Sequence, residues 1–589
     1  MSSLLSAIST GLSGIEAGQT AMQVIGQNLS NASTPGYHEQ SPNYISTTSG
    51  GTVGTGVDIA SIARYTDAPT ETAILQANSQ QNATSTQLGI AQQIQTILTA
   101  GGTSSSGTDG TNDSSGTNNS SIGTTLTSLF DQLTQLTSSP NSSAVASTVV
   151  SEASALAGQF NTAATGLAQL QSNLGGQISQ TVSQVNSLAS QIASLNTQIS
   201  GVEGQGGQPN DLLDQRDQLI NQLSQQVDVQ TVSQPLGVVN VLSSGGPIVL
   251  GNIASTFQAA EDPNGNMAVT QVGSNNLPAN FTGGTLGGQL QAFNQDIPTV
   301  SSQLDTLANT LSNQMNEIQA TGLGTSGPLT STQGTVSVAD PTADLSTQNL
   351  PSPVQAGQLV ISVTNTATGT RTNDTIAIDP TTQSLQDVAA AITSGTGGQV
   401  QASVNATTNT LQLTAQSGYS FDFAGRDTNP PSGSGVSNPD TAGILAGVGI
   451  NGLFSGTGAS NISVNPAVAA NPGLLSVSQT GEAGDSTNIQ KMAAIQNQAL
   501  IGGQTLTAQF TNIATAVGTN VQQMTDQQTS QTGLLQNLND QDQSVTGVDQ
   551  NQELVNMLSA QQLIQATSQF MSAVNTTLNS LLDIITPGT

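Results

Sequence analysis

The chain has 589 residues, and its 35 Asp and Glu against 5 Lys and Arg give a formal net charge of −30, with charged residues at only 7%. Five basic side chains cannot neutralise a phosphate backbone, which excludes a nucleic-acid partner. Zero Cys and one His exclude thiol chemistry, thiolate metal sites and paired-His motifs, so we expect no metal and no cofactor.

Residues 4–29 are predicted to form an amphipathic helix, because apolar side chains recur at steps of mostly three and four. This apolar stripe consists of Leu5, Ile8, Leu12, Ile15, Met22 and Leu29. A second line along the same helix holds only small residues, namely Ala7, Gly11, Gly14, Gly18 and Ala21. Each glycine costs about 1 kcal/mol of helix propensity. We therefore expect this helix to need neighbours that approach its small face closely.

A turn is predicted where this helix ends. The segment contains Asn28, Leu29, Asn31, Thr34, Pro35, Gly36 and Tyr37. Pro35 and Gly36 suit the two central positions of a type II turn, since Pro fixes φ and Gly accepts a positive φ. The neighbouring His38 is the chain's one histidine, and no nucleophile accompanies it, so we interpret it as a polar contact.

The C-terminal segment predicts a second assembly helix. Its apolar residues recur in heptads, at Met557, Ile564, Met571, Leu578 and Ile585, with Val574 and Leu581 among the positions three residues later. The seam lacks the usual flanking charge pairs. One hypothesis is a helix packed on its own domain. The other is that both terminal helices pair with each other, as a coiled coil, and with copies in adjacent subunits.

Long helices are predicted in the body of the chain. Helical periodicity covers 71–100 and 122–136, and apolar residues recur with a period of 3.6 from Leu156 to Ile199, where Gly175-Gly176 could introduce a bend. The Gly-, Ser- and Thr-rich stretch 101–121 between them is expected to be a flexible loop.

Arg216 lies in the next predicted helix, 212–223, for which Asp211 is a plausible N-cap. None of its neighbours three or four positions away is acidic. Two interpretations remain open. The stem of Arg216 snorkels along the apolar face, or the guanidinium makes a tertiary or intersubunit ion pair that fixes the helix.

Short alternating runs in 227–282 predict β-hairpins, and helix returns at 290–318. The segment 331–480 is predicted to be a mostly β domain, because it contains strand-like runs at 359–363, 375–378, 400–404 and 411–415. Ser384 and Asp387 are spaced as a capping box for a short helix. Helix resumes from about Asp485.

The fold class is therefore mainly α with inserted β, as an elongated multidomain protein. Paired terminal helices would form a coiled-coil domain, followed by a helical, rod-like middle domain with β-hairpins and a β-rich outer domain. The expected boundaries are 1–45 together with 546–589 for the terminal domain, 46–330 for the middle domain, 331–484 for the inserted outer domain, and 485–545 for the helical return.

The glycine-bearing first helix, the TPGY turn and the matching C-terminal helix resemble bacterial flagellar axial proteins. Three further segments are similar to the family of hook-associated protein 1, the hook–filament junction protein. They are QIASLNTQI (191–199) with PNDLLDQRDQLINQLS (209–224), the block 281–322 that begins FTGGTLGGQLQAFNQDIP, and the closing block 544–585 that begins SVTGVDQNQELVNM.

The resemblance implies a secreted structural subunit of the extracellular flagellum. It implies a homo-oligomeric ring with the hook protein on one side and a second junction protein or the filament on the other. It also implies an export chaperone that binds the C-terminal region, and type III export without a cleavable signal peptide. No apolar run approaches the ~20 residues of a membrane span, so we expect no membrane insertion.

Two other functions stay open at this point. The chain could be another axial protein, such as a hook or flagellin-like subunit, or a surface adhesin that uses the β-rich segment. An enzyme is not expected, because the acidic residues are scattered and no catalytic constellation is visible. The predicted pI of about 4.1 suggests an acidic habitat, since few Lys and Arg would repel one another when the carboxylates are neutralised.

Overall fold

A computed structural model describes residues 2–48, 54–99, 121–273, 277–428 and 435–585. The predicted flexible loop at 101–121 lies outside these residues except for Ser121. The chain divides into two compact units. Unit 1 comprises residues 1–90, 173–294 and 522–589, and unit 2 comprises 91–172 and 295–521.

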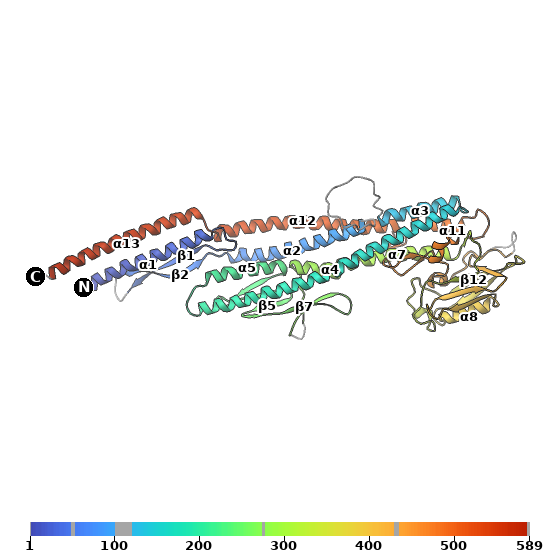
Figure 1. The fold of residues 1–589 in the computed structure, drawn as a ribbon, viewed down its shortest axis with the longest axis horizontal. Coiled ribbons are helices and arrows are strands. Elements are labelled where there is room, and N and C mark those ends of the chain that lie inside the picture. Colours follow the sequence, from blue (N-terminus) through green and yellow to red (C-terminus); the bar gives the residue numbers. More distant parts are fainter. Residues whose placement is uncertain (1, 49–53, 100–120, 274–276, 429–434, 586–589) are drawn as a thin grey trace. The chain divides into compact units, whose positions relative to one another are not determined.

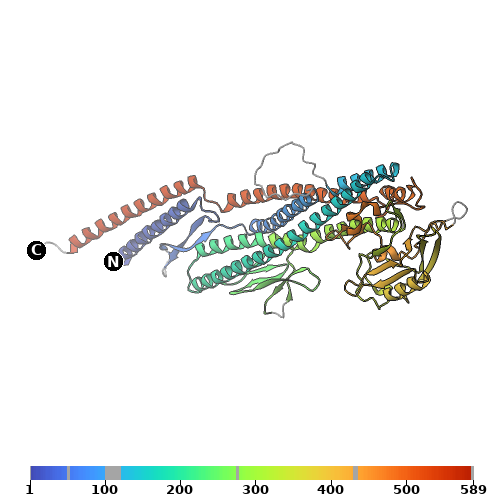
Figure 2. The ribbon, with the colours of Figure 1, turned by 45° about the vertical axis from the view of Figure 1, so that its right-hand side comes forward.

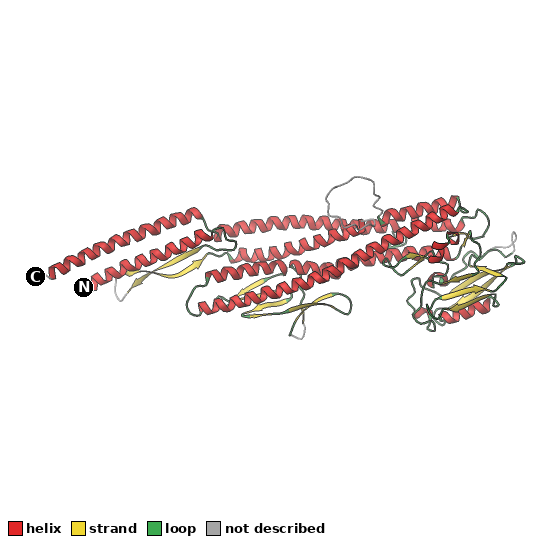
Figure 3. Ribbon diagram, viewed as in Figure 1, coloured by secondary structure: helices red, strands yellow, loops and turns green. Residues whose placement is uncertain are grey.

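Helices hold most of the regular structure in both units, and Figure 3 shows the strands as short segments beside them. The helices are α1 (Ser2–Asn31), α2 (Ala68–Thr99), α3 (Ile122–Ser138), α4 (Ser143–Glu203), α5 (Asn210–Gln226), α6 (Gly284–Gln291), α7 (Ile297–Ala320), α8 (Leu385–Gly395), α9 (Ile444–Gly447), α10 (Pro466–Ala470), α11 (Thr487–Ala494), α12 (Leu506–Thr546) and α13 (Gln550–Ile585). A π-helical turn, Ala292–Asp296, joins α6 to α7.

The strands form small antiparallel sheets. Those of unit 1 are β1 (Gln40–Thr48), β2 (Gly54–Arg64), β3 (Gln230–Ser233), β4 (Val239–Ser243), β5 (Gly246–Leu250), β6 (Ile253–Ala254), β7 (Phe257–Glu261), β8 (Met267–Gln271) and β9 (Leu277–Pro278). Those of unit 2 are β10 (Leu323–Gly324), β11 (Ser331–Gln333), β12 (Gly357–Asn365), β13 (Arg371–Ile378), β14 (Val400–Val404), β15 (Leu411–Ala415), β16 (Tyr419–Asp422), β17 (Phe454–Ser455), β18 (Ser463–Val464) and β19 (Ser476–Ser478).

In unit 1, α1 and α13 lie side by side and antiparallel, and the β1–β2 hairpin runs along α1 (Figures 1 and 2). The sheets β3-β4-β5-β6 and β7-β8-β9 adjoin the later part of α4. The apolar face of that helix is buried, from Leu174 and Ile178 to Ile199, as are Val241 and Val249 of the first sheet. These contacts form the core of the unit.

In unit 2, the β-rich segment has its own core. Two three-stranded sheets, β13-β12-β16 and β11-β15-β14, share one apolar cluster with α8 and α9. Ile361, Leu413 and Ile392 of this cluster are fully buried. The capping box predicted at Ser384 and Asp387 is confirmed at the start of α8. The remaining helical core of the unit includes α3, whose residues Leu126 to Leu136 are buried along one face.

The structure continues α4 through Gly175-Gly176 without interruption. One local expectation was wrong, and one element was not predicted. Helix α5 begins at Asn210 after Pro209, so Asp211 lies in its first turn and is not the N-cap. The hairpin β1–β2 was not predicted, because its strands are exposed or half-buried almost throughout and lack the alternating apolar pattern of a strand with one buried face.

One device recurs in both units: a helical asparagine whose side-chain amide pairs with the backbone of a strand residue. The amide nitrogen donates to a carbonyl and the amide oxygen accepts from an N–H. The pairs are Asn28 with Gln40, Asn186 with Phe257, Asn196 with Val239, Asn294 with Met267, and Asn316 with Phe454. In a chain with few charges, these neutral amides attach sheet edges to helices.

Candidate assembly site

The small-residue line of α1 is the face that packs on α13. A Cβ added to Gly11 would stand 2.6 Å from Met571 Sδ, and one added to Gly18 would stand 2.7 Å from Ile564 Cγ1. Further along, Ala21 and Ile25 form a small buried cluster with Ala560, flanked by Met22 and Met557. At Gly11 and Gly18 even a methyl group would overlap a side chain of α13, so glycine allows the two helices to approach closely there.

The predicted apolar stripe of α1 is only partly covered within the chain. Met22 packs against the cluster that α1 forms with α13. Ile8 and Ile15 are half-buried, and Leu5, Leu12 and Leu29 are 67%, 49% and 37% exposed. The stripe therefore leaves large apolar side chains on the surface of α1.

The heptad residues of α13 follow the expected seam for most of its length. Met557, Ile564, Met571, Val574 and Leu578 are half-buried. Leu581 departs from the seam and is 45% exposed. Ile585 ends the helix, and its side chain lies outside the described part of the chain. Outside the seam, α13 exposes Leu554, Val555, Leu558, Leu563 and Phe570, although the ring of Phe570 also reaches Gly11 of α1.

The turn after α1 has the predicted form. Pro35 and Gly36 occupy its centre, Gly36 has a φ of +75°, and the Tyr37 amide donates to the Thr34 carbonyl at 3.2 Å. The nearby Asn31 lies on the last turn of the helix, where its side chain donates to the Gln27 carbonyl. The TPGY turn thus reverses the chain at a defined point.

Asn28 connects this turn to the hairpin. It is 1% exposed, and its Oδ1 accepts from the Tyr37 hydroxyl at 2.7 Å and from the Gln40 amide at 3.0 Å. Burial is the main reason that the pKa of Tyr37 is raised to about 12, with nearby carboxylates such as Asp214 adding to it. The Tyr37 hydroxyl therefore stays a hydrogen-bond donor throughout the neutral range.

The hairpin is held on α1 by further polar contacts. The Thr10 hydroxyl donates to the Thr55 carbonyl at 3.1 Å, and the Val57 amide donates to the Ser13 hydroxyl at 3.2 Å. Gly56, with a φ of +138°, sits so close to α1 that a Cβ would stand 2.1 Å from Ser13 Oγ. Helix α1 is thus covered by α13 and by this hairpin.

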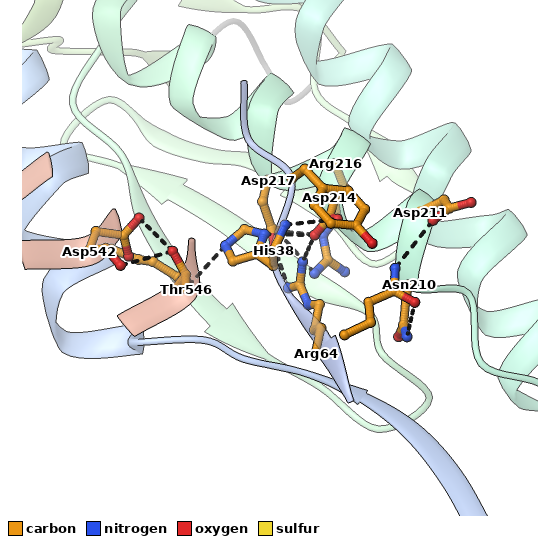
Figure 4. A network of polar contacts seen from close by, with 12 residues as sticks. His38, Arg64, Asn210, Asp211, Asp214, Arg216, Asp217, Asp542 and Thr546 are labelled. Atoms are coloured by element: carbon orange, nitrogen blue, oxygen red, sulfur yellow. Dashed lines mark hydrogen bonds and ion pairs between the residues drawn. The ribbon is translucent and has the colours of Figure 1, made fainter. Parts of the chain in front are cut away.

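Behind the turn lies a cluster of charged side chains, which we call the polar joint: His38, Arg64, Glu71, Asp214, Arg216 and Asp217. Figure 4 shows His38 and Arg64 directed at Asp214 on α5. His38 Nδ1 is 2.7 Å and Arg64 Nη1 is 2.6 Å from Asp214 Oδ1. Arg64 also reaches Asp217 at 2.5 Å. Three of the six side chains in the sequence that can carry positive charge are gathered here.

Arg216 is 4% exposed and has two partners. It pairs with Asp217, its immediate neighbour in α5, and donates to the carbonyl of Gly237 in the β3–β4 turn. The ion pair is therefore local, because Asp217 is the next residue in the helix and not one three or four positions away. The tertiary contact of Arg216 is the hydrogen bond to Gly237. Burial lowers the pKa of Arg216 despite the nearby Asp217, although an arginine remains charged at any physiological pH.

The polar joint was missed at the level of sequence. His38 and Asp214 are 176 residues apart, and no local pattern links them. One signal could have pointed to it: the run Asp214–Asp217 holds three charged residues in a chain where charge is scarce. The described residues contain no group of three or more His, Cys, Asp or Glu placed to hold a metal ion. None of the described helices is long and apolar enough to cross a membrane.

Comparison with known proteins gives consistent relatives. Residues 110–334 match the family described as "Flagellar hook-associated protein FlgK helical domain", and residues 8–38 match "Flagella basal body rod protein". The chain is 26% identical to flagellar hook-associated protein 1 of Salmonella typhimurium (strain LT2) over 599 residues, which cover 99% of this chain and 100% of the relative.

The relative of the same name from Escherichia coli (strain K12) is also 26% identical, over 342 residues that cover 56% of this chain and 59% of the relative. Among solved structures, the flagellar hook junction protein FlgK from Burkholderia pseudomallei is similar, with 21% identity and a TM-score of 0.49. That match covers 81% of this chain and 100% of the solved chain.

Proposed function

Because the chain belongs to the flagellar hook-associated protein 1 family, we propose that it is a structural subunit of the bacterial flagellum at the junction between hook and filament. The full-length similarity to hook-associated protein 1 favours this function over that of a hook or flagellin-like subunit. The match of residues 110–334 to the helical domain of the same family favours it further.

We further propose that the subunits associate through α1 and α13, and that these helices order as the subunits polymerise. The observation that carries this proposal is how little α13 buries within its own chain. Among its residues up to Leu581, Glu553 and Ala560 are the buried ones, while five large apolar residues between Leu554 and Phe570 are exposed. A pair of helices with so small a shared core is marginal alone in water.

The remaining parts of the proposal rest on the family. The copies would form a ring, with the hook protein on one side and a second junction protein or the filament on the other. A cytoplasmic chaperone would hold the C-terminal region before export by the flagellar type III apparatus. The exposed apolar residues of α13 support a need for such protection, because they would otherwise promote aggregation.

Electron microscopy of purified protein added to bare hooks tests this function. We expect the intact chain to add to hook ends, and the variant lacking residues 550–589 to stay a monomer and leave the hooks bare. The double variant Val555→Gln and Leu558→Gln should also fail, because it removes exposed apolar contacts of α13. Val272→Gln, an exposed apolar residue of unit 1 outside the terminal helices, is the matched control and should add normally.

Hydrogen exchange tests the ordering step separately. In the free subunit, amides of 1–30 and 555–589 should exchange without protection, and they should become protected on addition to hooks. Strong protection in the free subunit would contradict folding on assembly while leaving the junction function intact.

A further inference from the structure

The polar joint brings four separate segments of unit 1 together around one histidine. His38 follows the TPGY turn, Arg64 ends β2, Glu71 lies in the first turn of α2, and Asp214 lies on α5. Next to His38, the Glu39 amide donates to the carbonyl of Thr546 at the end of α12. We infer that His38 is a proton-dependent lock, which fastens the turn after α1 to α5 and α2 when its ring is charged and loosens it when the ring is neutral.

The two ring nitrogens of His38 face different carboxylates. Nδ1 lies 2.7 Å from Asp214 Oδ1, and Nε2 lies 3.8 Å from Glu71 Oε1. This Glu71 oxygen is buried and has no hydrogen-bond partner. A neutral imidazole carries one N–H, which donates to Asp214. The charged ring carries two N–H groups, so it can donate to Asp214 and also form an ion pair with Glu71.

The charges of the joint balance only when His38 carries a proton. His38, Arg64 and Arg216 then supply three positive charges against those of Glu71, Asp214 and Asp217. Loss of the proton leaves a partly buried cluster with an excess carboxylate. An uncompensated charge in such surroundings is strongly unfavourable, so the contacts that hold the cluster together become weaker.

All other titratable groups near the joint are acidic or stay neutral. Asp211 lies on α5, Asp67 precedes α2, Asp542 lies on α12, and Glu39 follows His38, close to Asp549 and Glu553 at the start of α13. Tyr37 keeps its proton throughout the neutral range. None of these groups can replace the positive charge that His38 loses.

The direction of the pKa shifts agrees with this geometry. Burial lowers the pKa of His38 and Arg64 repels its proton, but the hydrogen bond and the charge of Asp214, helped by Glu71, outweigh both and raise the pKa above 6.5. Burial is also the leading reason that the pKa of Glu71 lies above 4.5. Groups with raised pKa values bind protons more tightly in the folded state.

The sign of the pH dependence follows from linkage. The contribution of His38 to stability is complete below its unfolded pKa of about 6.5, and it is lost as the pH rises through the higher folded value. Glu71 acts in the same sense at lower pH. The joint therefore tightens as the medium becomes mildly acidic and loosens as it becomes alkaline.

The free subunit is sufficient for the test, because the joint lies outside the terminal stretches 1–30 and 555–589. As the sole histidine of the chain, His38 can be titrated directly by NMR. Two backbone amides report on the joint: Glu39, which donates to the Thr546 carbonyl, and Tyr65, which donates to the Glu39 carbonyl. Their exchange is measured from pH 5 to 9 and corrected for the intrinsic rate.

We expect the folded pKa of His38 to exceed 6.5, and protection of both amides to fall about tenfold for each unit of that excess as the pH rises. In His38→Gln this pH dependence should vanish. Glu71→Gln, which keeps the shape and removes the charge, should lower the pKa of His38 while the fold is retained. The inference is overturned if His38 titrates at or below 6.5, or if the wild type and His38→Gln lose protection with the same pH profile.

Discussion

Asn28 and Gln40 pair as two neighbouring strands would, although Asn28 lies on a helix. Its Nδ2 donates to the Gln40 carbonyl at 2.8 Å, and its Oδ1 accepts from the Gln40 amide at 3.0 Å. Through this one side chain, the last turns of α1 determine where the hairpin β1–β2 begins.

Asn28→Ala should therefore release the start of β1. Two hydrogen bonds to Gln40 and one from Tyr37 are lost, and at about 1 kcal/mol each the free energy of local opening should fall by about 2–3 kcal/mol. Amide exchange at Gln40 in the assembled protein measures this quantity. Asn31→Ala, which removes only local contacts at the exposed end of α1, is the control, and an equal effect of the two variants would contradict the role of Asn28.

Two glycines of α1 should respond oppositely to the same substitution. Gly26 has open space where a Cβ would stand, so Gly26→Ala should stabilise α1 by about 1 kcal/mol of helix propensity. Gly18→Ala places a Cβ 2.7 Å from Ile564 Cγ1, and overpacking of this kind costs about 1–3 kcal/mol. Amide protection of α1 in the assembled protein compares them. Equal gains at both positions would show that α13 does not pack on Gly18.

Arg216→Ala should destabilise the protein more than Arg371→Ala. Arg216 is buried and holds the Gly237 carbonyl in the β3–β4 turn, whereas Arg371 is half-exposed on β13. Loss of a charged hydrogen bond that leaves a carbonyl unpaired costs about 1.5–3 kcal/mol. Thermal unfolding of the two variants provides the comparison, and equal melting together with equal assembly would refute the prediction.

Leu236, in the turn that Arg216 holds, has a φ of +59° and is 53% exposed. A bulky L-residue is strained in this conformation, which asparagine tolerates better. Leu236→Asn should therefore stabilise the protein by about 1 kcal/mol. Leu250→Asn replaces a leucine of β5 that is 47% exposed and whose φ is not positive, and it should give no gain in the same melting experiment.

Asp485 should stabilise unit 2 far into the acidic range. Burial would raise its pKa, but hydrogen bonds from Ser478 and Thr487, among others, outweigh it and hold the pKa well below 3.8. A depressed pKa gives stability that is present above the ordinary value and is lost only as the pH falls through the folded one. The melting temperature of Asp485→Asn should thus stay below that of the wild type from pH 7 to about pH 4.

The difference in melting temperature between the wild type and Asp485→Asn should narrow only below about pH 4. Asp131→Asn, at an exposed carboxylate of α3, is the matched control and should melt like the wild type throughout. A difference that closes already between pH 7 and pH 5 would contradict the assignment of Asp485.

The periodicity of the sequence determined which residues form helices and which of them share a helix face. The heptads from Met557 to Leu578, the run from Leu156 to Ile199 and the turn at Pro35-Gly36 could be predicted, because each depends on neighbours within a few positions. The hairpin β1–β2 could not be predicted, since its strands bury almost no residue fully and are held by contacts with α1 instead of an apolar face of their own.

Only the tertiary structure decided which face of a helix is covered. Two lines of residues on α1 were plausible contacts, and the small one around Gly18 packs on α13 because glycine lets the two helices approach closely. Likewise, the amide pairs such as Asn28 with Gln40 and the gathering of His38, Arg64 and Asp214 join positions far apart in the chain. The energies of these contacts depend on the distance between the groups and on their burial. Neither quantity can be read from the sequence, because the residues concerned are far apart in the chain and form no local charge pattern.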